Sequence, residues 1–143
     1  MDEGLSGQGR CMCGAISFEL SGPLRDVVFC HCDECRRGAG GFWSATATHV
    51  DRLNVKDPND LLSWYQSSDQ ARRGFCSRCG SSLFFERTDG SGFIGVAAGA
   101  LEKPTGLMAS VHIFASEQGD YYQLDDGLRV IQDGSHGLRT PGF

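Results

Sequence analysis

The sequence predicts an all-β fold with small helical pieces, and three observations support this prediction. Short segments rich in aromatic and branched residues recur along the chain, glycine occupies 20 of 143 positions, and no segment keeps a helical period over three turns. Residues 15–20 show the strand pattern most clearly. Their apolar side chains Ile16, Phe18 and Leu20 fall on one face of the strand and the polar ones on the other.

Further strands are expected wherever an apolar segment lies between clusters of turn-forming residues. Glycine, proline, asparagine and aspartate separate these segments throughout the chain. One brief helical turn is expected at residues 36–41, where two glycines end it. The expected strands are residues 61–66, 72–75, 82–87, 93–98 and 110–115.

Length and composition predict a single folded domain. The chain carries 40% hydrophobic and 22% charged residues, which is typical of globular proteins and argues against general disorder. Polar, glycine-containing ends lead us to expect a flexible N-terminus at residues 1–10 and a flexible tail at residues 132–143. Residues 11–131 are the expected domain.

The overall charge and the apolar pattern exclude some classes of function. A net charge of −5 does not suit general nucleic-acid binding, because the phosphate backbone is bound by clustered lysine and arginine. No apolar stretch is long enough to span a bilayer, and the first ten residues lack the apolar run of a secretory signal. We therefore expect a cytoplasmic protein whose thiols stay reduced.

The seven cysteines are the strongest functional signal in the sequence. Seven is an odd number, which suits metal binding better than a set of disulfides, and the cysteines fall into three clusters. Residues 76–80 form a Cys-x-x-Cys-Gly knuckle, and residues 11–14 form a version that is one residue shorter. The glycine after each pair relieves the turn. Together the two clusters predict one closed zinc site with the ligands Cys11, Cys13, Cys76 and Cys79.

A closed site of four cysteines is structural. It would tie an early strand to a late hairpin across more than sixty residues, and such sites contribute roughly 10 kcal/mol or more of apparent folding free energy. The alternative is that these cysteines are ordinary buried thiols. Paired knuckles with trailing glycines favour the metal site over that alternative.

The central cluster predicts a second zinc with an open coordination position. Cys30, Cys32 and Cys35 offer three thiolates, which leaves a tetrahedral ion one ligand short. Alternatively, His31 or His112 could close the site and make it structural. A redox pair is a further alternative, but such a pair is usually a Cys-x-x-Cys at the N-terminus of a helix. An iron–sulfur cluster would require a fourth cysteine, and the other four cysteines already form a set of their own.

All three clusters, in their order and spacing, resemble the glutathione-dependent formaldehyde-activating enzyme family, whose domain is shared with centromere protein V. The resemblance runs from about Cys11 to Val130 and includes all seven cysteines, with Cys-His-Cys-x-x-Cys-Arg-Arg at residues 30–37. Residues 96–101, 111–114 and 121–128 also look like the closing strands of the family. The resemblance implies a β-tent fold with zinc-ribbon-like sheets and two zinc ions per chain.

The implied activity is that of a carbon–sulfur lyase which joins glutathione to formaldehyde as S-hydroxymethylglutathione. The substrate thiol would become the fourth ligand of the three-cysteine zinc and attack a small aldehyde. Arg36 and Arg37 are candidates for binding the substrate's carboxylates, because arginine binds them through two hydrogen bonds. The alternative function is a zinc-stabilised scaffold that binds a protein. The expected partners are a thiol and an aldehyde rather than a nucleic acid or a membrane, and a homodimer is possible.

Overall fold

The structure is a computed structural model that describes residues 5–141. It confirms the all-β prediction, since the described residues contain strands, one short α-helix and three 3₁₀ turns. The strands are β1 (Leu5–Arg10), β2 (Ser17–Ser21), β3 (Val27–Cys30), β4 (Trp43–His49), β5 (Leu53–Lys56), β6 (Leu62–Ser68), β7 (Ala71–Cys76), β8 (Ser82–Arg87), β9 (Phe93–Ala97), β10 (Ala109–Ile113) and β11 (Arg129–Val130). The helix is α1 (Asp33–Ala39), and the turns are Val50–Arg52, Ala98–Ala100 and Ala115–Glu117.

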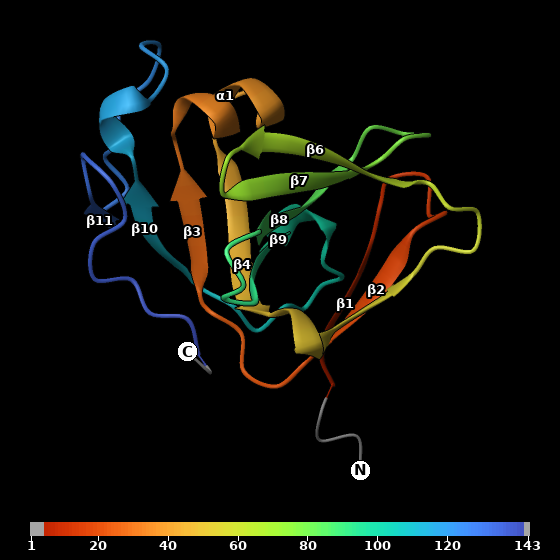
Figure 1. Cartoon of the computed structure of the whole chain (residues 1–143). Coiled ribbons are helices and arrows are strands. Elements are labelled where there is room, and N and C mark those ends of the chain that lie inside the picture. The colour runs from red at the N-terminus through yellow and green to blue at the C-terminus, as the bar shows by residue number, and fades with distance from the viewer. Residues whose placement is uncertain (1–4, 142–143) are drawn as a thin grey trace.

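The strands form two sheets that pack against each other, which agrees with the β-tent fold that the resemblance implied (Figure 1). The smaller sheet has the order β1-β2-β5 and is antiparallel. The larger sheet has the order β11-β10-β3-β4-β9-β8-β7-β6. In the larger sheet β10 runs parallel to both β3 and β11, while the other pairs are antiparallel.

The main core lies between the two sheets. Phe18 of β2 meets Phe84 of β8 edge to face, with ring centroids 5.2 Å apart, and Trp64 of β6 stacks on Phe84. Both phenylalanines are fully buried, as are Ile16 and Leu20, so the face assigned to residues 15–20 is the core face. The Phe18 ring lies directly against Gly9, where a Cβ atom would overlap it.

The helix begins three residues earlier than the expected turn at residues 36–41. Cys32 caps it, because its sulfur accepts a hydrogen bond from the backbone N–H of Cys35 at 3.4 Å. The chain leaves the helix at Gly40, whose positive φ of 89° lets its N–H bond to the carbonyl of Arg36. No helix within residues 5–141 is long and apolar enough to cross a membrane.

Both ends of the chain are more ordered than predicted. The expected flexible N-terminus contains β1, which pairs with β2 because its backbone completes the edge of the smaller sheet. The expected flexible tail contacts the body as well, since Ser116 donates to the carbonyl of Gln132 and Leu138 packs beside β3 and β10. Residues 1–4 and 142–143 of these two segments lie outside the described residues.

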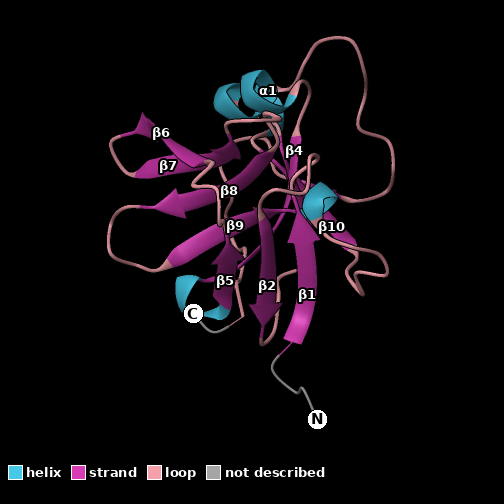
Figure 2. Ribbon diagram, turned by 90° about the vertical axis from the view of Figure 1, so that its right-hand side faces the viewer, coloured by secondary structure: helices cyan, strands magenta, loops and turns pink. Residues whose placement is uncertain are grey.

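The last expected family strand, residues 121–128, is not a strand. Most of this segment is irregular, and the short β11 follows it. Its side chains make the contacts instead, because Tyr122 hydrogen-bonds to the buried His31, which follows β3, and Asp126 hydrogen-bonds to the buried His112 of β10. By contrast with this irregular segment, β1, β2 and β5 form a sheet, which lies below α1 in the view of Figure 2.

Candidate metal centres and the adjoining cavity

The four cysteines of the first predicted site converge between the two sheets. The loop after β1 carries Cys11 and Cys13, while Cys76 ends β7 and Cys79 lies in the turn before β8. Their four sulfurs all lie within 4.8 Å of one another. The cluster therefore connects the smaller sheet to the larger one, as a crosslink would.

Both knuckles have the turn geometry that the glycines predicted. Gly14 and Gly80 have φ values of 79° and 80°, a region that only glycine enters at little cost. Their N–H groups donate to the carbonyls of Cys11 and Cys76, which closes each turn around its first ligand. The knuckles also contact each other, because Ser81 accepts a hydrogen bond from the backbone N–H of Met12 at 2.8 Å.

The sulfur positions fit a tetrahedral metal ion. Four sulfurs about 2.3 Å from a zinc ion lie about 3.8 Å from one another in a tetrahedron. The Sγ atoms of Cys11 and Cys13 are 3.6 Å apart, and those of Cys13 and Cys76 are 3.8 Å apart. These distances are far longer than a disulfide bond, and all seven cysteines are free thiols. The donor set and its spacing therefore suit zinc.

The second cluster forms where β3 meets α1. Cys30 is the last residue of β3, Cys32 caps the helix and Cys35 lies in its first turn. Three sulfurs again lie within 4.8 Å of one another. Cys35 is buried against Trp43 and Ala45 of β4, whereas Cys30 and Cys32 are half-buried. A strand end followed by a capped helix thus brings three ligands together within six residues.

The three neighbouring thiols differ in pKa, because their sulfurs hydrogen-bond to one another. Hydrogen bonds from the thiols of Cys30 and Cys35 lower the pKa of Cys32 to about 2, although burial acts in the opposite direction. The same contacts and burial raise the pKa of Cys30 well above its usual value. One thiolate is favoured but three are not, because their charges repel at close range. A bound cation would allow all three sulfurs to ionise.

No fourth protein ligand completes this cluster within residues 5–141. No other histidine, cysteine or carboxylate has its ligand atom within 4.8 Å of all three sulfurs. His31 and His112 were candidates to close the site. Their rings instead bond to each other, with His31 Nε2 2.8 Å from His112 Nδ1, and both are buried. The three-cysteine set is therefore incomplete.

A cavity of about 600 Å³ opens beside the three cysteines. Its charged lining is mainly cationic: Arg25, Arg73 and Arg87 contribute, while Glu34 is the one carboxylate among the described lining residues. Arg73 lies closest to the cluster, because its two terminal nitrogens are each 3.6 Å from the sulfur of Cys35. The cavity thus combines thiols with a cationic wall, a setting that suits an anionic ligand.

Arg25 and Arg87 also line the cavity, and both lie close to one aromatic residue. Their guanidinium carbons are 5.9 and 5.1 Å from the ring centroid of Phe93. Arg25 is half-buried; its Nη2 donates to the carbonyl of Ala45 at 3.3 Å, while its Nε is buried without a hydrogen-bond partner. Burial lowers the pKa of Arg25 to about 10, so its positive charge is incompletely compensated.

Arg36 and Arg37, the arginines predicted to bind substrate, lie elsewhere. Arg36 bonds to the carboxylate of Asp33 at 2.7 Å and Arg37 bonds to the same group at 3.1 Å. Neither residue lines the cavity. Reasoning from the sequence missed Arg73, although a signal was present: two consecutive arginines in one strand must point to opposite faces, and the strand leads directly to Cys76.

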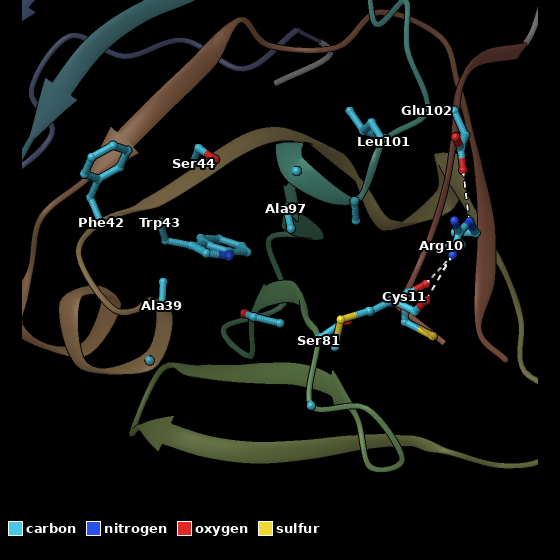
Figure 3. Close-up of a pocket in the computed structure, with 16 residues that line it drawn as sticks. Arg10, Cys11, Ala39, Phe42, Trp43, Ser44, Ser81, Ala97, Leu101 and Glu102 are labelled. Carbon is cyan, nitrogen blue, oxygen red and sulfur yellow. Dashed lines mark hydrogen bonds and ion pairs between the residues drawn. The ribbon is translucent and has the colours of Figure 1, made fainter. Parts of the chain in front are cut away.

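A second cavity of about 640 Å³ is also bordered by Trp43 (Figure 3). Its lining includes Cys11 and the ion pair between Arg10 and Glu102, which are 3.3 Å apart. Trp43 lines both cavities. None of the three central cysteines lines the second cavity, so the first is the one that adjoins the incomplete cluster.

Comparisons with known proteins point to one family. The sequence model of the glutathione-dependent formaldehyde-activating enzyme family matches residues 6–117. An uncharacterized lyase of Schizosaccharomyces pombe is 31% identical over 83 residues, which cover 58% of this chain and 59% of that protein. A Halomonas elongata protein provisionally named as a glutathione-dependent formaldehyde-activating enzyme is 34% identical over 86 residues, or 54% of each protein.

A solved structure has a similar fold. The crystal structure of a Rhodobacter sphaeroides protein is 28% identical to this chain and has a TM-score of 0.58, covering 71% of this chain and 97% of that one. The chain spans somewhat more than half of the length of the two curated relatives. The fold is thus shared with the Rhodobacter sphaeroides protein.

Proposed function

The chain belongs to the glutathione-dependent formaldehyde-activating enzyme family. From this premise we propose that it is a carbon–sulfur lyase. It would join a thiol to a small aldehyde, or release the two from their adduct. The observation that carries the proposal is the incomplete donor set of Cys30, Cys32 and Cys35 beside a cavity. Three protein ligands and an accessible fourth position are typical of zinc sites that do chemistry.

The reaction balances without a redox partner. Addition of the thiol forms one carbon–sulfur bond and opens the carbonyl double bond, and the oxygen then takes up a proton to give a hemithioacetal. Zinc held by the three cysteines would keep an incoming thiol deprotonated at neutral pH. The protein residues hold the thiol beside the aldehyde, and such positioning is itself a large source of rate enhancement.

Arg25 and Arg87 are the proposed binding groups for a carboxylate of the thiol, in place of Arg36 and Arg37. Both line the cavity next to the cysteines, and the Nε of Arg25 lacks a partner. Arg36 and Arg37 already share the carboxylate of Asp33. A thiol that carries carboxylates, such as glutathione, would supply the charge that this wall lacks.

Titration of thiols into cobalt-substituted protein tests the proposal. We expect millimolar glutathione to shift the thiolate-to-metal absorption bands, because a fourth sulfur enters the coordination shell of the three-cysteine centre. A neutral thiol such as 2-mercaptoethanol should produce the same shift at a higher concentration, since it lacks the carboxylates for Arg25 and Arg87. Unchanged bands with every thiol would contradict the enzymatic proposal and favour a protein-binding scaffold.

Arg73 is proposed to balance the negative charge of the thiolates. It is mostly buried, contacts Cys35 with two nitrogens, and pairs with Glu34 at 3.4 Å. The guanidinium of Arg73 also lies over the ring of Phe85, with its carbon 5.0 Å from the ring centroid. Groups that contact metal ligands in this way tune the affinity of the site.

Replacing Arg73 with glutamine should weaken both cobalt binding at the three-cysteine centre and thiol binding, each by about tenfold. The reason is that three thiolates, and then a fourth, would lose their nearest cation. Arg72→Gln is the matched control, because Arg72 faces the opposite side, stacks 3.8 Å from the Trp64 ring and pairs with Glu86. Chelator competition measures the metal affinity. Equal effects of the two substitutions would refute the role of Arg73.

A further inference from the structure

Two buried histidines behind the three-cysteine cluster are linked into a chain of hydrogen bonds. His31 Nε2 lies 2.8 Å from His112 Nδ1, and both side chains are almost completely inaccessible to solvent. The outer nitrogens also have partners: His112 Nε2 lies 2.8 Å from Asp126, and His31 Nδ1 lies 2.6 Å from the hydroxyl of Tyr122. All four ring nitrogens are therefore satisfied, as buried polar groups require.

The donors and acceptors of this hydrogen-bond network can all be assigned in one consistent direction, from Tyr122 to Asp126. The carboxylate of Asp126 can only accept, so His112 donates to it from Nε2 and must accept at Nδ1 if its ring is neutral. His31 then donates from Nε2, accepts at Nδ1, and receives the hydroxyl proton of Tyr122 in a hydrogen bond. Every donor finds an acceptor with both rings neutral.

The position of His31 connects this hydrogen-bond network to the three-cysteine cluster. His31 lies in the sequence between the proposed ligands Cys30 and Cys32, and its ring hydrogen-bonds to His112 rather than to their sulfurs. Its backbone N–H donates to the carbonyl of Ile113 at 3.0 Å. The ring also packs against Phe42, with centroids 5.0 Å apart. The residue is thus fixed by its backbone and by both ring nitrogens, and the sulfurs on either side of it are fixed with it.

We propose that Tyr122 and Asp126 are positioning residues of the three-cysteine centre, acting on it through His31 and His112. Both lie in the irregular segment 121–128, far along the chain from the cysteines. The inference rests on the proposed metal centre, but it requires neither a thiol nor an aldehyde. Because coupling is reciprocal, a metal bound by the three cysteines also stabilises the docked form of segment 121–128.

The test compares Tyr122→Phe with Tyr121→Phe. The first substitution removes one hydroxyl and leaves Nδ1 of His31 buried without a donor, whereas Tyr121 is 65% exposed. We expect Tyr122→Phe to weaken cobalt binding at the three-cysteine centre by about tenfold, which is the usual effect of losing an outer-shell partner. Tyr121→Phe should have no effect. The four-cysteine site is an internal control, and its affinity should not change.

Two results would overturn the inference. One is an unchanged affinity of the three-cysteine centre in Tyr122→Phe. The other is an equal loss at both metal sites, which would mean that the hydroxyl only supports the fold. Neither result depends on the lyase proposal, because metal competition needs no substrate. A protein that binds cobalt as expected but ignores thiols would refute the lyase and leave this inference standing.

Hydrogen exchange on the unmodified protein provides a second measurement, should Tyr122→Phe fail to fold. Filling the three-cysteine centre, with the four-cysteine site already loaded, should slow exchange at least threefold in peptides that cover residues 121–128. Peptides covering residues 53–60 of the smaller-sheet edge serve as the control and should not respond. Equal or absent protection in the two regions would refute the coupling.

Discussion

Replacing Cys76 with serine is expected to unfold the domain. Cys76 is fully buried at the end of β7, and its sulfur lies 3.8 Å from that of Cys13 in the loop after β1. The four-cysteine cluster joins the two sheets at this point. Loss of one ligand would remove most of the roughly 10 kcal/mol that such a site contributes, which is comparable to the whole net stability of a typical domain.

Thermal unfolding followed by circular dichroism measures this effect. The zinc-loaded parent protein should show one cooperative transition, and Cys76→Ser should show none or one at a much lower temperature. Prolonged treatment of the parent with a strong chelator should give the same result, because it removes the same crosslink. A Cys76→Ser protein that keeps its sheet signal and its melting temperature would contradict a structural role for this site.

Replacing Cys32 with serine is expected to leave the fold intact while removing the second metal and the activity. Cys32 is the N-cap of α1, and its sulfur accepts a hydrogen bond from the backbone N–H of Cys35. Serine is one of the preferred N-cap residues, so the helix should keep its start. The metal would then have only Cys30 and Cys35, and two ligands hold zinc weakly.

Metal analysis and an assay of thiol–aldehyde addition measure the two consequences. We expect two zinc ions per chain in the parent protein and one in Cys32→Ser, with a melting temperature that falls far less than in Cys76→Ser. The rate of addition should fall by about a hundredfold or more, because even changes outside the ligand shell cost 10–100-fold. Retention of two zinc ions, or unfolding as severe as in Cys76→Ser, would contradict the division into a structural and a chemical site.

The sequence predicted the parts of this protein that depend on local spacing. Two cysteines one or two residues apart, followed by glycine, can form a knuckle with little help from the rest of the chain, and both glycines adopt the expected positive φ. The same holds for Cys30, Cys32 and Cys35, which a strand end and a helix cap bring together. Alternation placed Phe18 on the core face for the same local reason.

Long-range contacts decided what local spacing could not. Arg36 and Arg37 were adjacent to the cysteines in sequence, yet Asp33 holds both of them on the helix. Arg73 reaches the cluster from 38 positions away, because pairing of β7 within the larger sheet sets which face it points to. The edge strand β1 escaped prediction because its polar, glycine-containing sequence becomes ordered only by pairing with β2.

The three-cysteine cluster and each of the two knuckles were therefore predictable from the local sequence, whereas the tertiary structure brought the two knuckles together and determined the surroundings of both clusters. Metal ligands separated by a few residues meet through turn geometry, which the local sequence encodes. The cations, histidines and tyrosine around them meet only after strands distant in sequence have paired. Hydrogen bonds such as those from Tyr122 to His31 and from His112 to Asp126 span 91 and 14 positions, and no local pattern specifies them.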